Sequence, residues 1–170
     1  RIINKDSNNT PVVWPSIIET RSYNYERVIN DPLCAQSIII KNDAFGNATD
    51  VLNIHYPRRD EISQSPYPAS LPETLYSSTY DDQQQTLHLV RKRLHLETIV
   101  DDDKWVMALP SASRSDAINL SKTQVPVTGI TLEECQRKSE IFLPSGDDTY
   151  LGHEKVYYLQ AKNIISFPPL

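Results

Sequence analysis

Gln85–Val100 has the sequence QTLHLVRKRLHLETIV, and three acidic residues, Asp101–Asp103, follow it directly. Placed on a helix at 100° per residue, its leucines and valines divide between two opposite faces. A surface helix instead keeps its apolar residues on one stripe, so the helix is a poor fit. This stretch decides the fold class, because the alternative is a long β-strand.

The same stretch fits a strand with one irregularity. Leu87 and Leu89 share one side of a strand, whereas Leu94 and Leu96 share the other side. The apolar side therefore changes across the basic triplet Arg91–Arg93. A β-bulge inserts one residue and resets the side, so we predict a long bent strand with a bulge at the triplet, or two strands divided there.

The two histidines of the stretch do not indicate a metal site. On a strand, His88 points away from Leu87 and Leu89, and His95 points away from Leu94 and Leu96. A structural zinc site needs about four converging ligands, and no pair of cysteines stands beside these histidines. We expect no metal and no cofactor.

The basic triplet has three interpretations. Charged side chains at a sheet edge prevent edge-to-edge pairing, which is the plainest one. A patch that binds another protein is the second. A nucleic-acid interface is the third, and it would use Arg58 and Arg59 together with Arg91, Lys92 and Arg93. The net charge of −5 disfavours a dominant phosphate-binding surface.

The rest of the chain predicts a mainly β fold, as a sandwich or barrel-like antiparallel sheet; an α+β fold is the alternative. Residues 35–56 predict a β-hairpin, with turn residues near Gly46. Residues 104–110 predict a short strand closed by Pro110. Residues 131–142 predict the one clear helix, since Thr131 and Glu134 have the spacing of a capping box.

Residues 57–80 form a long segment with four prolines and seven serines or threonines, which predicts an irregular loop. Tyr67, Tyr76 and Tyr80 fall in or beside it, and tyrosine is favoured at protein interfaces. The domain organisation that we predict is a flexible lead-in over residues 1–10 and a single β-rich domain over residues 11–170.

The composition leaves two alternatives for the compartment in which the protein resides. No apolar run approaches the roughly 20 residues of a membrane span, so we expect no membrane partner. Two cysteines, Cys34 and Cys135, are too few for a disulfide scaffold and favour a reducing, intracellular location in cytoplasm or nucleus. A secreted, glycosylated protein is the alternative, since Asn8, Asn47 and Asn119 begin glycosylation sequons.

Catalytic motifs are missing from the sequence. It has four glycines, and no phosphate-binding loop or nucleophile elbow. We therefore expect a non-catalytic interaction or scaffold domain that binds another protein and is part of a larger protein or complex. Two alternatives stay open: the nucleic-acid-binding domain described above, and a cation-dependent hydrolase that uses His153 with Asp147 and Asp148. The candidate binding residues are Arg58, Arg59, Tyr67, Tyr76, Tyr80, Arg91, Lys92 and Arg93.

Overall fold

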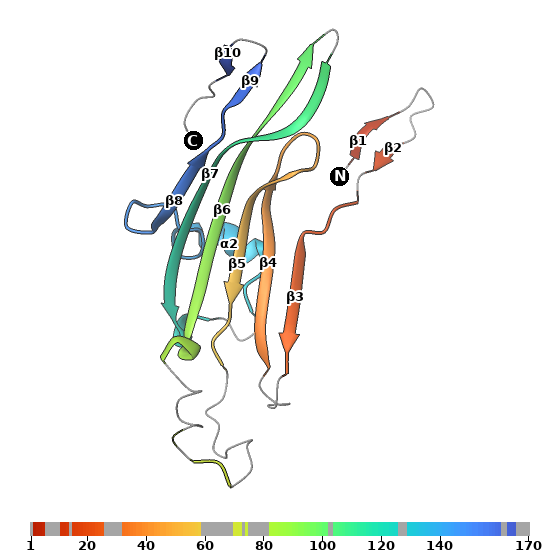
Figure 1. Cartoon of the computed structure of the whole chain (residues 1–170). Helices are drawn as coiled ribbons and strands as arrows, with labels where there is room; N and C mark the ends of the chain where they lie inside the picture. The colour runs from red at the N-terminus through yellow and green to blue at the C-terminus, as the bar shows by residue number, and fades with distance from the viewer. Residues whose placement is uncertain are drawn as a thin grey trace.

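The computed structural model describes residues 2–5, 11–13, 15–25, 32–58, 70–72, 74, 82–101, 104–125, 129–160 and 163–165. Six strands form one antiparallel sheet in which each strand lies beside the next one along the chain (Figure 1). They are β3 (Glu19–Asn24), β4 (Leu33–Asn42), β5 (Ala48–His55), β6 (Thr86–Asp101), β7 (Lys104–Ser121) and β8 (Tyr150–Lys155). The mainly β fold is confirmed, and so is the hairpin that β4 and β5 form.

The six-stranded sheet is open, with β3 and β8 as its edges. In the described part of the chain it does not close into a barrel, and no second large sheet packs on it as in a sandwich. Two small antiparallel sheets lie outside it. The first pairs β1 (Ile2–Lys5) with β2 (Pro11–Val13), and the second pairs β9 (Tyr158–Gln160) with β10 (Asn163–Ile165).

Strand β6 is one continuous strand, which is one of the two alternatives that we predicted. Its irregularities, however, do not lie at the basic triplet. The register shifts between His95 and Leu96 and again between Glu97 and Ile99. The basic triplet is regular strand: Arg91 pairs with Leu52 of β5 and with Asp116 of β7. The predicted bulge position is therefore wrong, because arginines continue the row of leucines on the same side of the strand.

Strand β7 extends well beyond Pro110, where we expected it to end. Pro110 pairs with Leu96 at one of the register shifts, a place where a missing N–H is tolerated. Beyond Pro110, serine, alanine and asparagine alternate with residues whose side chains lie on the covered face of the sheet. That alternation is the strand signal in the polar run 111–121.

Two short helices cover one face of the sheet (Figure 1). They are α2 (Leu132–Arg137) and α3 (Ser139–Phe142), so the helix predicted over 131–142 is broken at Lys138. The capping box of Thr131 and Glu134 is present, with both reciprocal bonds formed. The core between helices and sheet contains Ile38, Leu52, Ile54, Leu87, Leu89, Leu120, Ile130, Cys135 and Phe142, all buried.

Two polar side chains of the sheet hold the residue that leads into α2. Gln36 Nε2 donates to the Ile130 carbonyl at 2.8 Å, and the Ile130 N–H donates to the Tyr56 hydroxyl at 2.8 Å. Burial raises the pKa of Tyr56 to about 12, so this hydroxyl stays protonated and also donates to Gln36 Oε1. Gly129, with φ of 81°, makes the turn beside them.

The opposite face of the sheet has no element covering it among the described residues, and it carries both polar and apolar side chains. Because side chains alternate along a strand, this face carries the polar residues Ser37, Asn53, His55, His88, Lys92, Ser113, Ser115 and Asn119 and the apolar residues Ile39, Val51 and Val90. No helix that the structure describes is long and apolar enough to cross a membrane.

Two 3-10 helices complete the described elements: η1 (Asp82–Gln85) leads into β6, and η2 (Lys122–Gln124) follows β7. Most of the segment 57–80 lies outside the described residues, so its role as a long loop stays a prediction. Strand β1 falls within the expected lead-in over residues 1–10, whose flexibility also stays a prediction.

Candidate functional site

The covered face of the sheet changes from apolar to ionic as β6 runs upward in Figure 1. Leu87, Leu89, Arg91 and Arg93 occupy successive positions on this face, because all four have the same parity in a regular strand. The leucines pack against the helices. The arginines lie where the helices have ended, and they enter a polar network instead.

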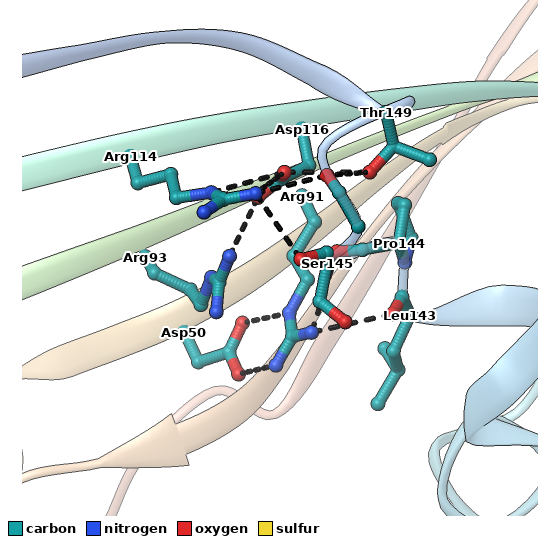
Figure 2. A network of polar contacts seen from close by, with 10 residues as sticks. Asp50, Arg91, Arg93, Arg114, Asp116, Leu143, Pro144, Ser145 and Thr149 are labelled. Atoms are coloured by element: carbon teal, nitrogen blue, oxygen red, sulfur yellow. Dashed lines mark hydrogen bonds and ion pairs between the residues drawn. The ribbon is translucent and has the colours of Figure 1, made fainter. Parts of the chain in front are cut away.

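Arg91 forms a two-pronged ion pair with Asp50 of β5 (Figure 2). Its Nε lies 2.9 Å from Asp50 Oδ1, and its Nη2 lies 2.6 Å from Asp50 Oδ2. The third nitrogen, Nη1, donates to the carbonyls of Leu143 and Pro144 at 3.3 and 3.4 Å. The hydrogen bond to Asp50 raises the pKa of Arg91, so its charge is fixed.

Asp116 of β7 is the second anchor of the network. Its side chain is fully buried and accepts from Arg93 Nη2 and from Arg114 Nη2, both at 2.8 Å. Burial by itself would raise the pKa of this carboxyl, but the hydrogen bonds from Arg114 and Arg93 outweigh it and lower the pKa. Asp116 is therefore ionised at neutral pH.

The network connects the sheet to the segment between α3 and β8 (residues 143–149). Arg114 Nη2 donates to the carbonyls of Ser145 and Gly146 at 3.1 and 2.9 Å. Thr149 Oγ1 donates to Asp116 Oδ1 at 3.4 Å. Together with the bonds from Arg91, these contacts satisfy carbonyls in a stretch without regular structure. Arg91, Arg93 and Arg114 are thus hydrogen-bonded to two carboxylates and to backbone carbonyls. These contacts hold residues 143–149 against the sheet.

The basic triplet is accordingly divided between the two faces. Arg91 and Arg93 point into the network, whereas Lys92 is exposed on the uncovered face. Arg58 is buried, and its Nε donates to Gln84 Oε1 at 3.2 Å. The other four candidate binding residues, Arg59, Tyr67, Tyr76 and Tyr80, lie outside the described residues. The four described residues thus do not share one surface, and the role of all eight in binding stays a prediction.

His153 lies beside a pocket on the edge strand β8. This pocket has a volume of about 240 Å³, and its walls include Ser113, Arg114, Tyr150, His153 and Glu154. The Arg114 guanidinium lies 5.3 Å from the centre of the Tyr150 ring, and the Tyr150 hydroxyl bonds to His153 Nδ1. Asp147 and Asp148 are exposed. Among the described residues, no three histidine, cysteine or acidic side chains converge to hold a metal ion.

His88 faces the uncovered side and bonds to two neighbours. Its Nδ1 lies 2.8 Å from Asn119 Oδ1, and its Nε2 lies 2.9 Å from the Gln83 carbonyl. Cys135 is buried, and desolvation raises the pKa of its thiol to about 12. The thiol therefore stays protonated at neutral pH and is a poor nucleophile.

Sequence reasoning missed the acidic half of the network and a second feature, an exposed apolar pair at the far end of the β6–β7 hairpin. Val100 and Trp105 are paired across the hairpin and are 71% and 72% exposed. The signal for Asp50 and Asp116 was their parity, which places them beside the arginines on neighbouring strands. For Trp105, the sequence carries no mark that separates an exposed aromatic residue from a buried one.

Comparison with known proteins assigns the chain to a family. Residues 1–109 match the family model described as "Insecticide toxin TcdB middle/C-terminal region". The chain is 32% identical to a chain of the TcdB2-TccC3 crystal structure, with a TM-score of 0.81 over 99% of its own length. The form of TcdB2-TccC3 without the hypervariable C-terminal region gives 34% identity over 96% of this chain and a TM-score of 0.78.

The Tc holotoxin pore of Photorhabdus luminescens is similar as well, with 36% identity over 90% of this chain and a TM-score of 0.75. The chain spans only a small part of these relatives: 8% of each TcdB2-TccC3 chain and 7% of the holotoxin pore chain. None of the curated proteins matches it.

These matches correct the predicted compartment. The relatives are an insecticide toxin region and a Tc holotoxin pore, so the intracellular location inferred from two cysteines is wrong. The inference failed because a domain with a large core does not need disulfides in any compartment, since disulfides are concentrated in small secreted domains. The family match, which covers more than half of the chain, shows that the chain belongs to the family of the insecticide toxin TcdB middle/C-terminal region.

Proposed function

We propose that this chain is a non-catalytic structural domain of a TcdB-like toxin component, and that it supports the assembly of that component with a TccC-like protein. The observation that carries the proposal is the 32% identity over 99% of the chain with TcdB2-TccC3. The TccC-like partner is inferred from that relative's name, since the chain itself carries no bound partner.

The geometry of the polar residues supports a structural role. Arg91, Arg93 and Arg114 are all engaged by buried or half-buried carboxylates and by carbonyls of residues 143–146. An enzyme site needs groups that converge on an open space where a substrate can lie. Here the charged groups converge on one another, which holds a loop against a sheet.

The two alternatives from the sequence are disfavoured on the same grounds. A phosphate-binding surface needs exposed cationic side chains, and Arg91 and Arg93 already neutralise Asp50 and Asp116. A hydrolase would need His153 beside a carboxylate, and its described ring partner is the Tyr150 hydroxyl.

The proposal is tested in a TcdB-like component that contains this chain. The triple variant His153→Ala, Asp147→Asn, Asp148→Asn removes the only hydrolase constellation that the sequence suggests. We expect the variant component to co-elute with a TccC-like protein in size-exclusion chromatography as the wild type does, and toxicity to be unchanged. Leu89→Asp, which places a charge in the core, should abolish co-elution.

Loss of toxicity in the triple variant with normal co-elution would contradict a non-catalytic role. Normal co-elution of Leu89→Asp, in a component whose fold is shown by circular dichroism to be disrupted in this domain, would contradict a role in assembly. Leu151→Asp is the control for the added charge, because Leu151 is exposed on β8.

A further inference from the structure

The β6–β7 hairpin continues past the rest of the sheet as a two-stranded arm, which we define as residues 96–109 (Figure 1). The pairing of β5 with β6 ends at Arg93, and the pairing of β7 with β8 ends at Ala112. From Arg93 to Asp101 the strand advances roughly 25 Å at about 3.3 Å per residue. Over this distance, the described strands β6 and β7 pair only with each other.

The arm is apolar on both of its faces. Val100 pairs with Trp105 on one face, and Met107 has the same parity as Trp105. Ile99 pairs with Val106 on the other face. Val106 and Met107 are each 39% exposed, so the apolar surface is not confined to the two residues at the end.

This apolar surface contrasts with the uncovered face of the main sheet. The apolar residues of that face, Ile39, Val51 and Val90, are partly buried, whereas Val100 and Trp105 in the arm are 71% and 72% exposed. A two-stranded hairpin is at best marginally stable alone in water. Tryptophan is also among the residue types enriched at the centres of protein interfaces. The arm therefore has the composition of a segment that is covered in the assembled protein.

We propose that the arm inserts into an apolar groove, rimmed by lysine or arginine, on another part of the same long toxin polypeptide. This inference rests on the proposed function, because it takes the chain to be one domain of a TcdB-like component. The length of the relatives supports a groove in the same polypeptide. The match covers 8% of the TcdB2-TccC3 chain, so most of that chain lies outside the matched region.

The charge at the end of the arm gives the chemistry of the groove. Asp101 ends β6 and pairs with Lys104 at the start of β7, and Asp102 and Asp103 stand between these two residues in the sequence. Acidic residues around an apolar anchor select a partner surface with basic residues around an apolar groove, since like charges there would repel. The same aspartates disfavour insertion into a bilayer, where each one is costly.

Site-specific photo-crosslinking in a full-length TcdB-like component tests the proposal. A benzophenone amino acid replaces Trp105 in one variant and Ile17 in the control, because Ile17 is 67% exposed and lies outside the arm. We expect the residue at position 105 to crosslink to a segment of the same polypeptide outside residues 1–170. The crosslink should form with and without a TccC-like protein, and the mapped peptide should contain apolar residues flanked by lysine or arginine.

Three outcomes would overturn the proposal: crosslinks from position 105 only to the TccC-like protein, crosslinks only to lipid, or a yield no higher than at position 17. If the component still assembles with the TccC-like protein in any of these cases, the proposed function stands, but the proposed binding site of the arm is wrong. Failure of the proposed function is instead read from the co-elution experiment.

A second measurement covers the case in which the photoreactive residue perturbs the arm. Limited proteolysis of the full-length Trp105→Ser component should cut within residues 96–109 about tenfold faster than in the wild type, since loss of the anchor releases the arm. Trp105→Phe should restore most of the protection, and Ile17→Ser should leave the rate unchanged. Equal cleavage rates in all four proteins would overturn the proposal.

Discussion

Arg91 and Arg93 stand on the covered face of β6 where a leucine would be expected, and this substitution explains the error in the predicted bulge. In the sequence the apolar residues alone change side across the basic triplet, so the arginines resemble a break in the pattern. The structure shows that the pattern continues, with ion pairs to Asp50 and Asp116 in place of apolar packing. A buried face tolerates charges when each is paired and hydrogen-bonded.

Gly129 gives a prediction at the scale of one residue. Its φ of 81° is costly for other residues, and an added Cβ would lie 3.3 Å from Arg21 Nη1 and 3.4 Å from the Tyr56 hydroxyl oxygen. We expect Gly129→Ala to lower the free energy of unfolding of the chain by about 1 to 2 kcal/mol, measured by urea denaturation.

Gly152→Ala is the matched control, because a Cβ at Gly152 meets no atom within 4 Å. Its free energy of unfolding should stay within about 0.5 kcal/mol of the wild type. Equal effects of the two substitutions would show that the turn at Gly129 does not position the entry to α2.

At the scale of elements, the ionic network fastens the segment 143–149 to the sheet, and most elements themselves were predictable. The hairpin of β4 and β5, the capping box of α2 and the strand β6 follow from local patterns that the sequence displays. The full length of β7 was missed because Pro110 resembled a strand end. The network was missed because its partners come from three strands and a loop, and only pairing register brings them together.

The network predicts how stability depends on pH. The pKa of Asp116 in the folded chain lies below its ordinary value of 3.8, because Arg114 and Arg93 hold the ionised form against the opposing effect of burial. Its stabilising contribution is therefore present above about pH 4 and is lost as the pH falls through the lower, folded-state pKa. We expect Asp116→Asn to lower the free energy of unfolding at pH 7 by about 3 kcal/mol, measured by urea denaturation.

The difference between Asp116→Asn and the wild type should narrow progressively below pH 4, as the wild-type carboxyl takes up its proton. Glu19→Gln is the control: its ion pair with Arg21 is partly exposed, so the change at pH 7 should stay within about 1 kcal/mol. A difference for Asp116→Asn that is constant from pH 7 to pH 2.5 would count against the ionised carboxylate as the stabilising group.

At the scale of the whole molecule, the main sheet of the described residues is supported on one face, and an arm extends beyond that support (Figure 1). This division is the basis for the proposal that the arm contacts another part of a toxin component. The sequence predicted the β fold and a role in a protein complex. It did not predict the toxin family, which only comparison with relatives could supply.

Amide hydrogen exchange of the 170-residue chain, resolved by mass spectrometry, tests the division into supported sheet and arm most directly. Residues 87–93 are paired with β7, residues 88–93 are also paired with β5, and their side chains on the covered face are packed or ion-paired, whereas residues 96–101 are paired with β7 alone. We predict that amides in residues 87–93 exchange at least about a hundredfold more slowly than those in residues 96–101. Equal rates in the two halves of β6, or faster exchange in residues 87–93, would contradict this account.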